Sequence, residues 1–405
     1  MPHTSAQNRA RNSGRNVFCD IFGVRVKKFF ASIYSPEPCN TGRQFELDIF
    51  RFILIYRLAI VHVFVEASPP ASLDVLGVPY YFDSVVGGVV GAPRFVIMMG
   101  IGLAYTRHGS PKELLQRGIK IGIVGLVLNV CRYLIPSLIG YAISGDSVKY
   151  LKPLPYLFFG NDILQFVALA MILMSLLLYL KLTPAKIMGV ALVLSVIGTF
   201  LRSVDCHNTV LNVILGHFIG TETASGDPFI YSDFPLLIWF IFYAFGFLFG
   251  HFYRHLKDKK RFYLLVSPIC IVIATAFCIW EIRGGFGMMM GEGANVFYHM
   301  HTGEALICII ACLGLLIIPF GLSFILPESW KKPVMAVSRN VNSIYCIHWV
   351  LVWWTVDLFL YCSKAGPYLS NGPAYLLGLG LSILSMVLAQ IWYQIKVKYK
   401  KRKTI

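Results

Sequence analysis

The stretch FELDIFRFILIYRLAIVHVF, residues 45–64, decides how the rest of the chain is interpreted. It is long and apolar enough to cross the hydrocarbon core of a bilayer, which takes about 20 residues. However, Asp48, Arg51, Arg57 and His62 interrupt it where a plain membrane anchor would carry aliphatic side chains. Ionisable groups at such depth are costly in lipid and normally face a partner or a water-filled cavity. The first span therefore predicts a functional pathway.

The composition places the whole chain in the class of polytopic membrane proteins. Of its 405 residues, 57% are hydrophobic and 14% charged, and the mean hydropathy is +0.66. The net charge of +16 does not indicate nucleic acid, because basic residues in short loops between apolar runs report membrane orientation. Ten cysteines are scattered without a Cys-x-x-Cys pair or metal-ligand spacing, so we expect small buried side chains and no metal.

Ten stretches have the length and hydropathy of membrane helices, which predicts an all-α fold. A soluble inserted domain is not predicted, and we expect one transmembrane domain over residues 46–395. The predicted spans are residues 47–67, 85–106, 118–143, 162–180, 186–201, 233–253, 262–281, 303–325, 340–360 and 374–395.

The distribution of lysine and arginine predicts that both termini are cytoplasmic. Most of the 36 basic residues fall in the two terminal segments and in alternate loops, and the opposite side holds only Lys149, Lys152, Arg202, Arg283 and Lys364. Residues 1–45 form a basic leader without a signal-peptide cleavage pattern. Within it, CDIFGVRVKKFF predicts an amphipathic segment on the inner leaflet, and residues 396–405 form a basic tail.

Helix geometry predicts one polar stripe along the first span. Eleven residues separate Arg51 from His62, and eleven steps of about 100° overshoot three turns by only about 20°. Asp48 and Glu66 fall near the same stripe, and the helical rise puts His62 roughly 16 Å beyond Arg51. The alternative interpretation is that the arginines snorkel to lipid head groups while His62 hydrogen-bonds within the bundle.

The polar pattern of the first span, together with five later stretches in the same order, resembles membrane acyltransferase family 3 and the wider superfamily of lysosomal heparan-alpha-glucosaminide N-acetyltransferase. Arginine, ten residues and then histidine on the first span is the feature we associate with it. Further stretches similar to the family follow in order: GAPRFVIMMGIGLAYTR, SPKELLQRGIKIGIVG, NDILQFVAL, FPLLIWFIFYAFGFLFG and SRNVNSIYCIHWVL. The chain departs from the family at Arg94, where an apolar residue is expected, and at Lys120, which replaces an arginine.

The resemblance implies transfer of an acyl group, commonly acetyl, from cytoplasmic acyl-CoA to a hydroxyl or amine of an extracytoplasmic glycan. The sequence has no Asn-x-Ser/Thr sequon, which is compatible with an integral protein of a bacterial inner membrane. The polyanionic end of CoA would be held at the inner mouth by Arg51, Arg117 and Lys120, since guanidinium groups match phosphate oxygens. The thioester would then lie near His62, which can act as a general base or carry the acyl group itself.

A histidine base usually needs a group that orients its second nitrogen. Asp162 is the first candidate and Glu66, one turn from His62, the second. Asp162 has an alternative role as a helix N-cap together with Asn161. His348 either lines an acyl pocket or satisfies a buried partner.

Further candidates come from the interior of other spans. Arg94 and Arg132, assigned to donor binding, could also stabilise an oxyanion or pair with Asp162. Gln165 belongs to the motif NDILQFVAL and is assigned with His348 to the acceptor or acyl pocket. A transporter is the competing function, but two matching halves with interrupted spans, which it would need, are not found in the sequence.

Overall fold

The computed structural model describes residues 28–29, 31–67, 91–202, 204–221, 233–283, 298–362 and 368–403. Within these ranges the chain is helical, and the extended residues form only two isolated bridges rather than a strand. The leader segment lies largely outside the described residues, and so do residues 222–232 and 284–297 of the two longest connections between predicted spans. The all-α prediction is confirmed.

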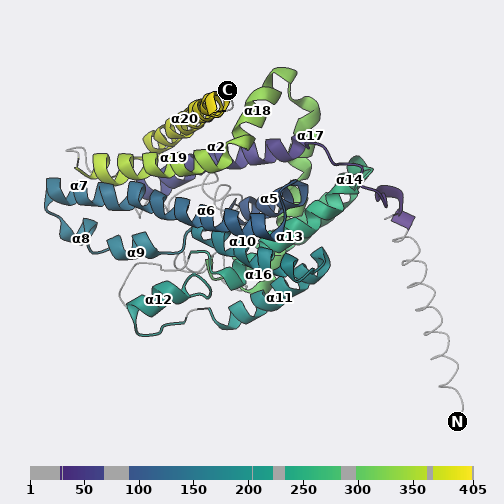
Figure 1. Ribbon diagram of the computed structural model, residues 1–405, viewed down its shortest axis with the longest axis horizontal. Helices are drawn as coiled ribbons and strands as arrows, with labels where there is room; N and C mark the ends of the chain where they lie inside the picture. The colour runs from purple at the N-terminus through teal and green to yellow at the C-terminus, as the bar shows by residue number, and fades with distance from the viewer. Residues whose placement is uncertain are drawn as a thin grey trace, which may run out of the picture.

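Each of the ten predicted spans contains at least one helix (Figure 1). Two of them include a π-helical segment, η2 and η3. The elements are α2 (Phe45–Ala67), α5 (Gly91–Tyr105), α6 (Pro111–Asn129), η2 (Val130–Leu134), α7 (Ile135–Ser144), α8 (Ser147–Tyr150), α9 (Leu154–Phe159), α10 (Ile163–Tyr179), α11 (Pro184–Phe200), α12 (Thr209–Leu215), α13 (Leu236–Arg254), α14 (Lys259–Ile282), α16 (Thr302–Leu315), α17 (Ile317–Ile325), α18 (Glu328–Arg339), α19 (Val341–Trp353), η3 (Trp354–Leu360) and α20 (Asn371–Lys403).

Length and composition alone qualify six of the described helical stretches as membrane spans, and α5, α10 and α11 are shorter apolar helices. The helix α2 is absent from both groups although it is 23 residues long, because it carries too many charged side chains for its length. At the other end of the chain, α20 continues through the predicted basic tail to Lys403. Lysine and arginine have good helix propensity, so the helix need not end where the apolar run does.

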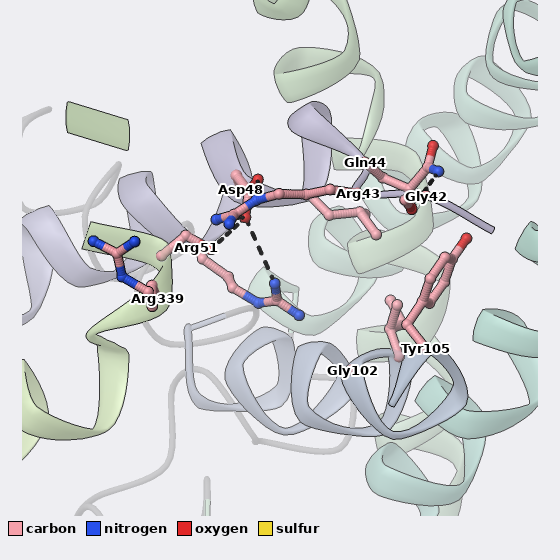
Figure 2. Close-up of a pocket in the computed structure, with 11 residues that line it drawn as sticks. Gly42, Arg43, Gln44, Asp48, Arg51, Gly102, Tyr105 and Arg339 are labelled. Carbon is pink, nitrogen blue, oxygen red and sulfur yellow. Dashed lines mark hydrogen bonds and ion pairs between the residues drawn. The ribbon is translucent and has the colours of Figure 1, made fainter. Parts of the chain in front are cut away.

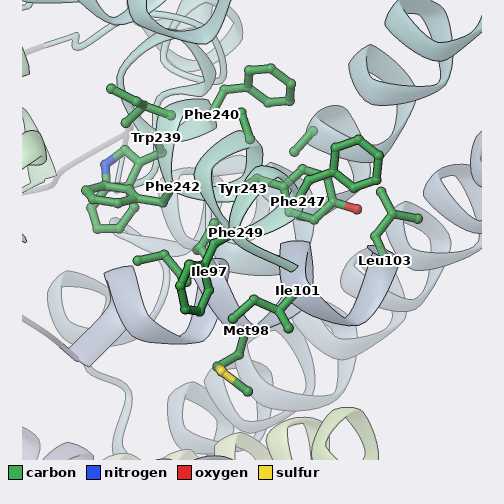
Figure 3. Packing of buried hydrophobic residues seen from close by; sticks show 14 of the residues in the cluster. Ile97, Met98, Ile101, Leu103, Trp239, Phe240, Phe242, Tyr243, Phe247 and Phe249 are labelled. Carbon is green, nitrogen blue, oxygen red and sulfur yellow. The ribbon is translucent and has the colours of Figure 1, made fainter. Parts of the chain in front are cut away.

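The central contact of the bundle is the close packing of α5 on α13 (Figure 3). The sequence FGFLFG places Gly246 and Gly250 four residues apart on α13, the small-residue spacing that lets membrane helices approach closely. A Cβ built on Gly246 would lie 2.1 Å from the carbonyl oxygen of Ile97, and one on Gly100 would lie 2.2 Å from that of Tyr243. Only glycine fits at these positions.

The helix α2 lies between α20, α19 and α18 rather than at the edge of the bundle (Figure 1). Ser382 of α20 donates its hydroxyl to the carbonyl oxygen of Tyr56 at 2.6 Å. Gly378 lies so close to Ile60 that a Cβ would be 2.7 Å from its Cα. The polar stripe of α2 is therefore held among other helices.

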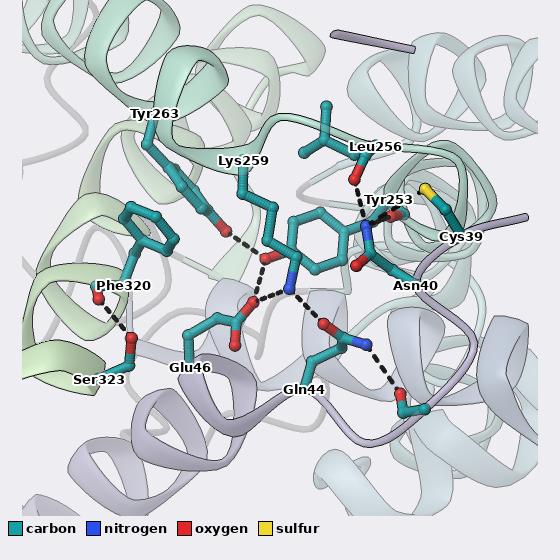
Figure 4. A network of polar contacts seen from close by, with 11 residues as sticks. Cys39, Asn40, Gln44, Glu46, Tyr253, Leu256, Lys259, Tyr263, Phe320 and Ser323 are labelled. Carbon is teal, nitrogen blue, oxygen red and sulfur yellow. Dashed lines mark hydrogen bonds and ion pairs between the residues drawn. The ribbon is translucent and has the colours of Figure 1, made fainter. Parts of the chain in front are cut away.

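A polar network fixes the start of α2 against α13 and α14 (Figure 4). The Glu46 carboxylate accepts a hydrogen bond from the Tyr253 hydroxyl at 2.5 Å and pairs with Lys259 Nζ at 2.5 Å. The Tyr263 hydroxyl donates to that of Tyr253 at 2.9 Å, and Lys259 also contacts Gln44. Because Glu46 is buried, its charge has to be compensated by such partners.

The α5–α13 contact predicts the effect of adding a single methyl group. Gly246→Ala forces the two helices apart, and we expect it to lower the free energy of unfolding by about 1 to 3 kcal/mol. The control is Gly189→Ala on α11, where a Cβ meets nothing within 4 Å. Thermal unfolding of the two purified variants in detergent measures the difference. Equal melting temperatures would contradict the close approach of α5 and α13.

Candidate active site

The arginine end of α2 opens into a pocket of about 270 Å³ (Figure 2). Arg43, Arg51 and Arg339 line it together with Asp48, Gly102 and Tyr105. A second pocket of about 230 Å³ shares Arg51 and Arg339 and continues along α2 past Leu54 and Ile55. We call the two together the mouth pocket.

The charges of the mouth pocket do not balance. Asp48 is 2% exposed and accepts hydrogen bonds from Arg43 at 2.6 and 3.0 Å and from the Ser338 hydroxyl at 2.5 Å. Arg51 lies 3.8 Å from the same carboxylate and makes only a long hydrogen bond, 3.4 Å, to the Met98 carbonyl. The exposed Arg339 guanidinium lies over the ring of Tyr393 at 4.0 Å. Three guanidinium groups around one carboxylate can bind a polyanion.

The histidine end of α2 meets α19. The ring centroid of His62 lies 4.0 Å from that of Trp349 and 5.5 Å from that of His348. His348 directs Nδ1 at the Ile344 carbonyl oxygen, 3.3 Å away, so Nδ1 is the donor and Nε2 carries the lone pair. Among the described residues, Nε2 of His348 and Nε1 of Trp349 have no hydrogen-bond partner although both are buried.

A buried ion pair stands beside these rings. Arg132 donates from Nη2 to Asp162, and Asn129 Oδ1 accepts from Arg132 at 3.0 and 3.2 Å. The Tyr345 hydroxyl donates to both oxygens of Asp162, at 3.0 and 3.2 Å. The Arg132 guanidinium lies 5.0 Å from the ring of Trp349, and its Nη1 has no partner within the described part of the chain. Unpaired buried polar atoms are rare in native proteins, so several of them together indicate a place for a polar ligand or water.

The local structure explains why these side chains converge. Arg132 lies in the π-helical segment η2, a distortion that often marks functional sites because it redirects side chains. Asp162 is the N-cap of α10, where its Oδ1 accepts the amide N–H of Ile163 at 2.6 Å. Asp162 thus combines the two roles considered for it, N-cap and partner of Arg132. His62 and Asp162 are near enough to interact electrostatically.

Asp233, in the segment before α13, is a further acidic neighbour of the pair. Its amide donates to the Asn161 carbonyl oxygen at 3.2 Å. The Asp162 carboxylate and the Arg132 guanidinium are its charged neighbours.

The remaining predicted residues have other neighbours as well. Glu66 has Asp357 and Lys149 as its electrostatic neighbours, and those two form an ion pair of 2.9 Å. Arg94 is buried with its guanidinium 5.7 Å from the ring of Phe50. The two basic residues of α6, Arg117 and Lys120, do not line the mouth pocket.

Gln165 lines a different, apolar cavity together with residues of α6, α9 and α12. His217 also lines that cavity. The cavity shares no lining residue with the mouth pocket.

Several residues of the mouth pocket and of the cluster around His62 were not predicted from the sequence. Arg43, Arg339 and Trp349 reach α2 from other segments, and Tyr345 reaches Asp162 from α19. No spacing along one helix signals these contacts. Trp349 follows directly after His348, yet only its position on α19 brings it against His62.

Comparison with known families identifies the fold. Residues 44–391 match the family described as acyltransferase domain, which covers most of the chain. The chain belongs to membrane acyltransferase family 3. It is therefore an integral membrane acyltransferase. Neither the comparison with curated proteins nor that with solved structures gave a match.

The buried ion pair predicts a strong effect of removing one partner. Arg132→Met leaves the Asp162 carboxylate without its counterion, and we expect a loss of about 3 to 5 kcal/mol in the free energy of unfolding. Adding Asp162→Asn removes the uncompensated charge and keeps a capping side chain, so the double variant should recover part of the loss. Thermal unfolding in detergent measures both. A double variant no more stable than Arg132→Met would contradict this account.

Proposed function

We propose that this acyltransferase takes an acyl group, commonly acetyl, from cytoplasmic acyl-CoA and transfers it to a hydroxyl or amine of an extracytoplasmic glycan. One observation carries the proposal. A single helix, α2, presents Arg51 to a pocket with excess positive charge and His62 to a cluster of unpaired buried polar atoms. Their separation along the helix, roughly 16 Å, suits a donor with a polyanionic end and a long, nearly neutral arm.

The mouth pocket supplies the binding half. The phosphates of the donor would interact with Arg51 and Arg339, whose guanidinium groups are less fully compensated than that of Arg43. Charge-assisted, bidentate contacts to phosphate are the strongest polar contacts a protein can offer. Arg117 and Lys120 would guide the donor toward the membrane surface rather than line the pocket.

The histidine cluster supplies the chemical half. A neutral His62 imidazole can take the proton of the acceptor as its oxygen or nitrogen attacks the thioester carbonyl, and CoA leaves as the thiol after receiving a proton. The unpaired Nη1–H of Arg132 can donate a hydrogen bond to the oxyanion that develops. His348, 5.5 Å away, is placed to pass a proton or to position the acyl group.

The first prediction from this proposal separates the two histidines. His62→Ala should reduce acyl transfer by about 10² to 10⁴, the usual contribution of a general base, with normal membrane abundance. His348→Ala should cause a smaller loss. Initial rates of thiol release from acetyl-CoA with acceptor present measure the effect. Wild-type turnover in His62→Ala would remove it from the reaction.

The second prediction separates binding from chemistry. Arg51→Ala should weaken acyl-CoA binding by about 1.5 to 3 kcal/mol, the scale of a hydrogen bond to a charged group. Arg339→Ala should act in the same direction. His62→Ala should bind the donor normally, and so should Arg107→Ala, a matched control that is exposed and outside the mouth pocket.

Calorimetric titration with a non-hydrolysable acyl-CoA measures these affinities. Arg51→Lys should recover only part of the loss, because an ammonium group cannot reproduce the guanidinium fork. If Arg51→Ala binds the donor as tightly as Arg107→Ala does, Arg51 only contacts lipid head groups.

The proposal requires the mouth pocket to face the cytoplasm, with both termini on that side. A cysteine placed at the exposed Lys332 should then react with thiol reagents only from the cytoplasmic side. A cysteine at the exposed Lys152 should react only from outside. Labelling of right-side-out and inverted vesicles, with native exposed cysteines replaced, measures this. The reverse pattern would place the donor pocket on the wrong side.

A further inference from the structure

A large apolar cavity lies between α6, α9, α10 and α12. Its volume is about 770 Å³, nearly three times that of the larger part of the mouth pocket. Its walls are aliphatic and aromatic, and five of the lining side chains are among the exposed large hydrophobic residues of the molecule. These five are Leu126, Phe159, Val210, Ile214 and Phe218. Exposed apolar patches of this kind on a membrane protein are suited to contact with lipid, so we take the cavity to open toward the bilayer.

One polar side chain in the wall has no partner. Gln165 is 9% exposed, and neither its amide nitrogen nor its oxygen is hydrogen-bonded among the described residues. An unpaired buried amide is costly, because both a donor and an acceptor are desolvated without compensation. A ligand of this cavity is therefore apolar along most of its length and polar at the end that reaches Gln165.

The cavity wall is tied to the site of the reaction. Asn129 donates Nδ2–H to the carbonyl oxygen of Phe158, which lines the cavity, at 2.8 Å, and it also holds Arg132. Gln165 lies one helical turn from Asp162 on α10. A polar group beside Gln165 is thus close to the ion pair that stands next to His62.

The position of the cavity selects between the two substrates. The mouth pocket lies at the N-terminal end of α2 and the C-terminal end of α5, and the chain passes from there directly into the start of α6. At that same end, Ser175 near the C-terminus of α10 donates to the Pro111 carbonyl oxygen at 2.6 Å. The cavity instead involves the later turns of α6 and the first turns of α10, toward the opposite end of the bundle. The proposed donor site is the mouth pocket at one end of the bundle. An apolar chain bound in the cavity toward the other end would therefore belong to the acceptor.

We infer that the acceptor is lipid-anchored and that its hydrocarbon chain enters this cavity from the bilayer, with its polar head group at Gln165. This inference rests on the proposed function. It assigns Gln165 to acceptor recognition and gives α9 and α12 the role of enclosing the chain.

Photolabelling tests the inference without requiring acyl transfer. The probe is dodecyl glucoside with a diazirine in its chain, added to the full-length protein in detergent micelles. The label should map to cavity-lining peptides of α10 and α12 and should be displaced by unlabelled dodecyl glucoside.

Two tryptophan variants of α12 provide the matched comparison. Val213→Trp fills the cavity and should lower the labelling about tenfold, because it excludes methylene groups that are otherwise buried. Leu211→Trp lies on the same helix outside the cavity lining and should label like the unmodified protein. Equal melting temperatures would show that both variants are folded. Equal labelling of the two folded variants would overturn the inference.

Further labelling experiments distinguish other occupants of the cavity. If phosphatidylglycerol displaces the probe as effectively as dodecyl glucoside does, the cavity holds a structural lipid and the inference is overturned. If diazirine-bearing palmitoyl-CoA labels the cavity preferentially, the cavity belongs to the donor, and this result too would overturn the inference. Gln165→Leu should keep chain binding but lose the preference for dodecyl glucoside over a plain alkyl diazirine. Normal labelling without any acyl transfer would instead contradict the proposed function alone.

Discussion

The buried contact between Arg132 and Asp162 is the interaction on which the arrangement of the site depends. Inside a bilayer no water compensates a charge, so each ion of the pair has to be satisfied by protein groups. Asn129 on α6 and Tyr345 on α19 provide the remaining hydrogen bonds, and Asp162 caps α10 at the same time. The pair thereby joins three helices and fixes α19 where its Trp349 ring receives His62.

The two ends of α2 differ in their electrostatic surroundings. At the mouth, the Asp48 carboxylate is hydrogen-bonded by Arg43 and Ser338. Arg51 is farther from this carboxylate, so its charge is less compensated and it is suited to bind an anion. At the other end Arg132 is paired with Asp162, and the unpaired atoms of this cluster belong to the rings of His348 and Trp349 and to Nη1 of Arg132. A pocket that binds a polyanion needs excess positive charge, whereas proton transfer needs a neutral imidazole. Separating the two along one helix allows both.

The parts of this arrangement that follow from a single helix were predictable. The alignment of Arg51 with His62 depends only on their spacing, and α2 is helical across both. The pairing of Arg132 with Asp162 was one of two predicted alternatives. By contrast, Arg43 and Arg339 converge on Arg51 from different segments, and Arg117, predicted at the mouth, does not line the pocket. Charge and motif order along a sequence do not specify which faces of two helices meet.

Hydropathy also gives an incomplete account of which helices matter most. By length and composition α2 does not qualify as a span, although it is surrounded by α18, α19 and α20 and carries residues of both halves of the site. Its charged stripe is tolerated because neighbouring helices and pockets, rather than lipid, contact it. The apolar cavity at Gln165 is the converse case, since its exposed aliphatic walls are suited to lipid while one amide is not. In both places the residue that contradicts its surroundings is the basis of a proposal, an anion at Arg51 and an amphipathic lipid at Gln165. In that proposal, binding from opposite ends of the bundle would bring the two substrates together beside His62.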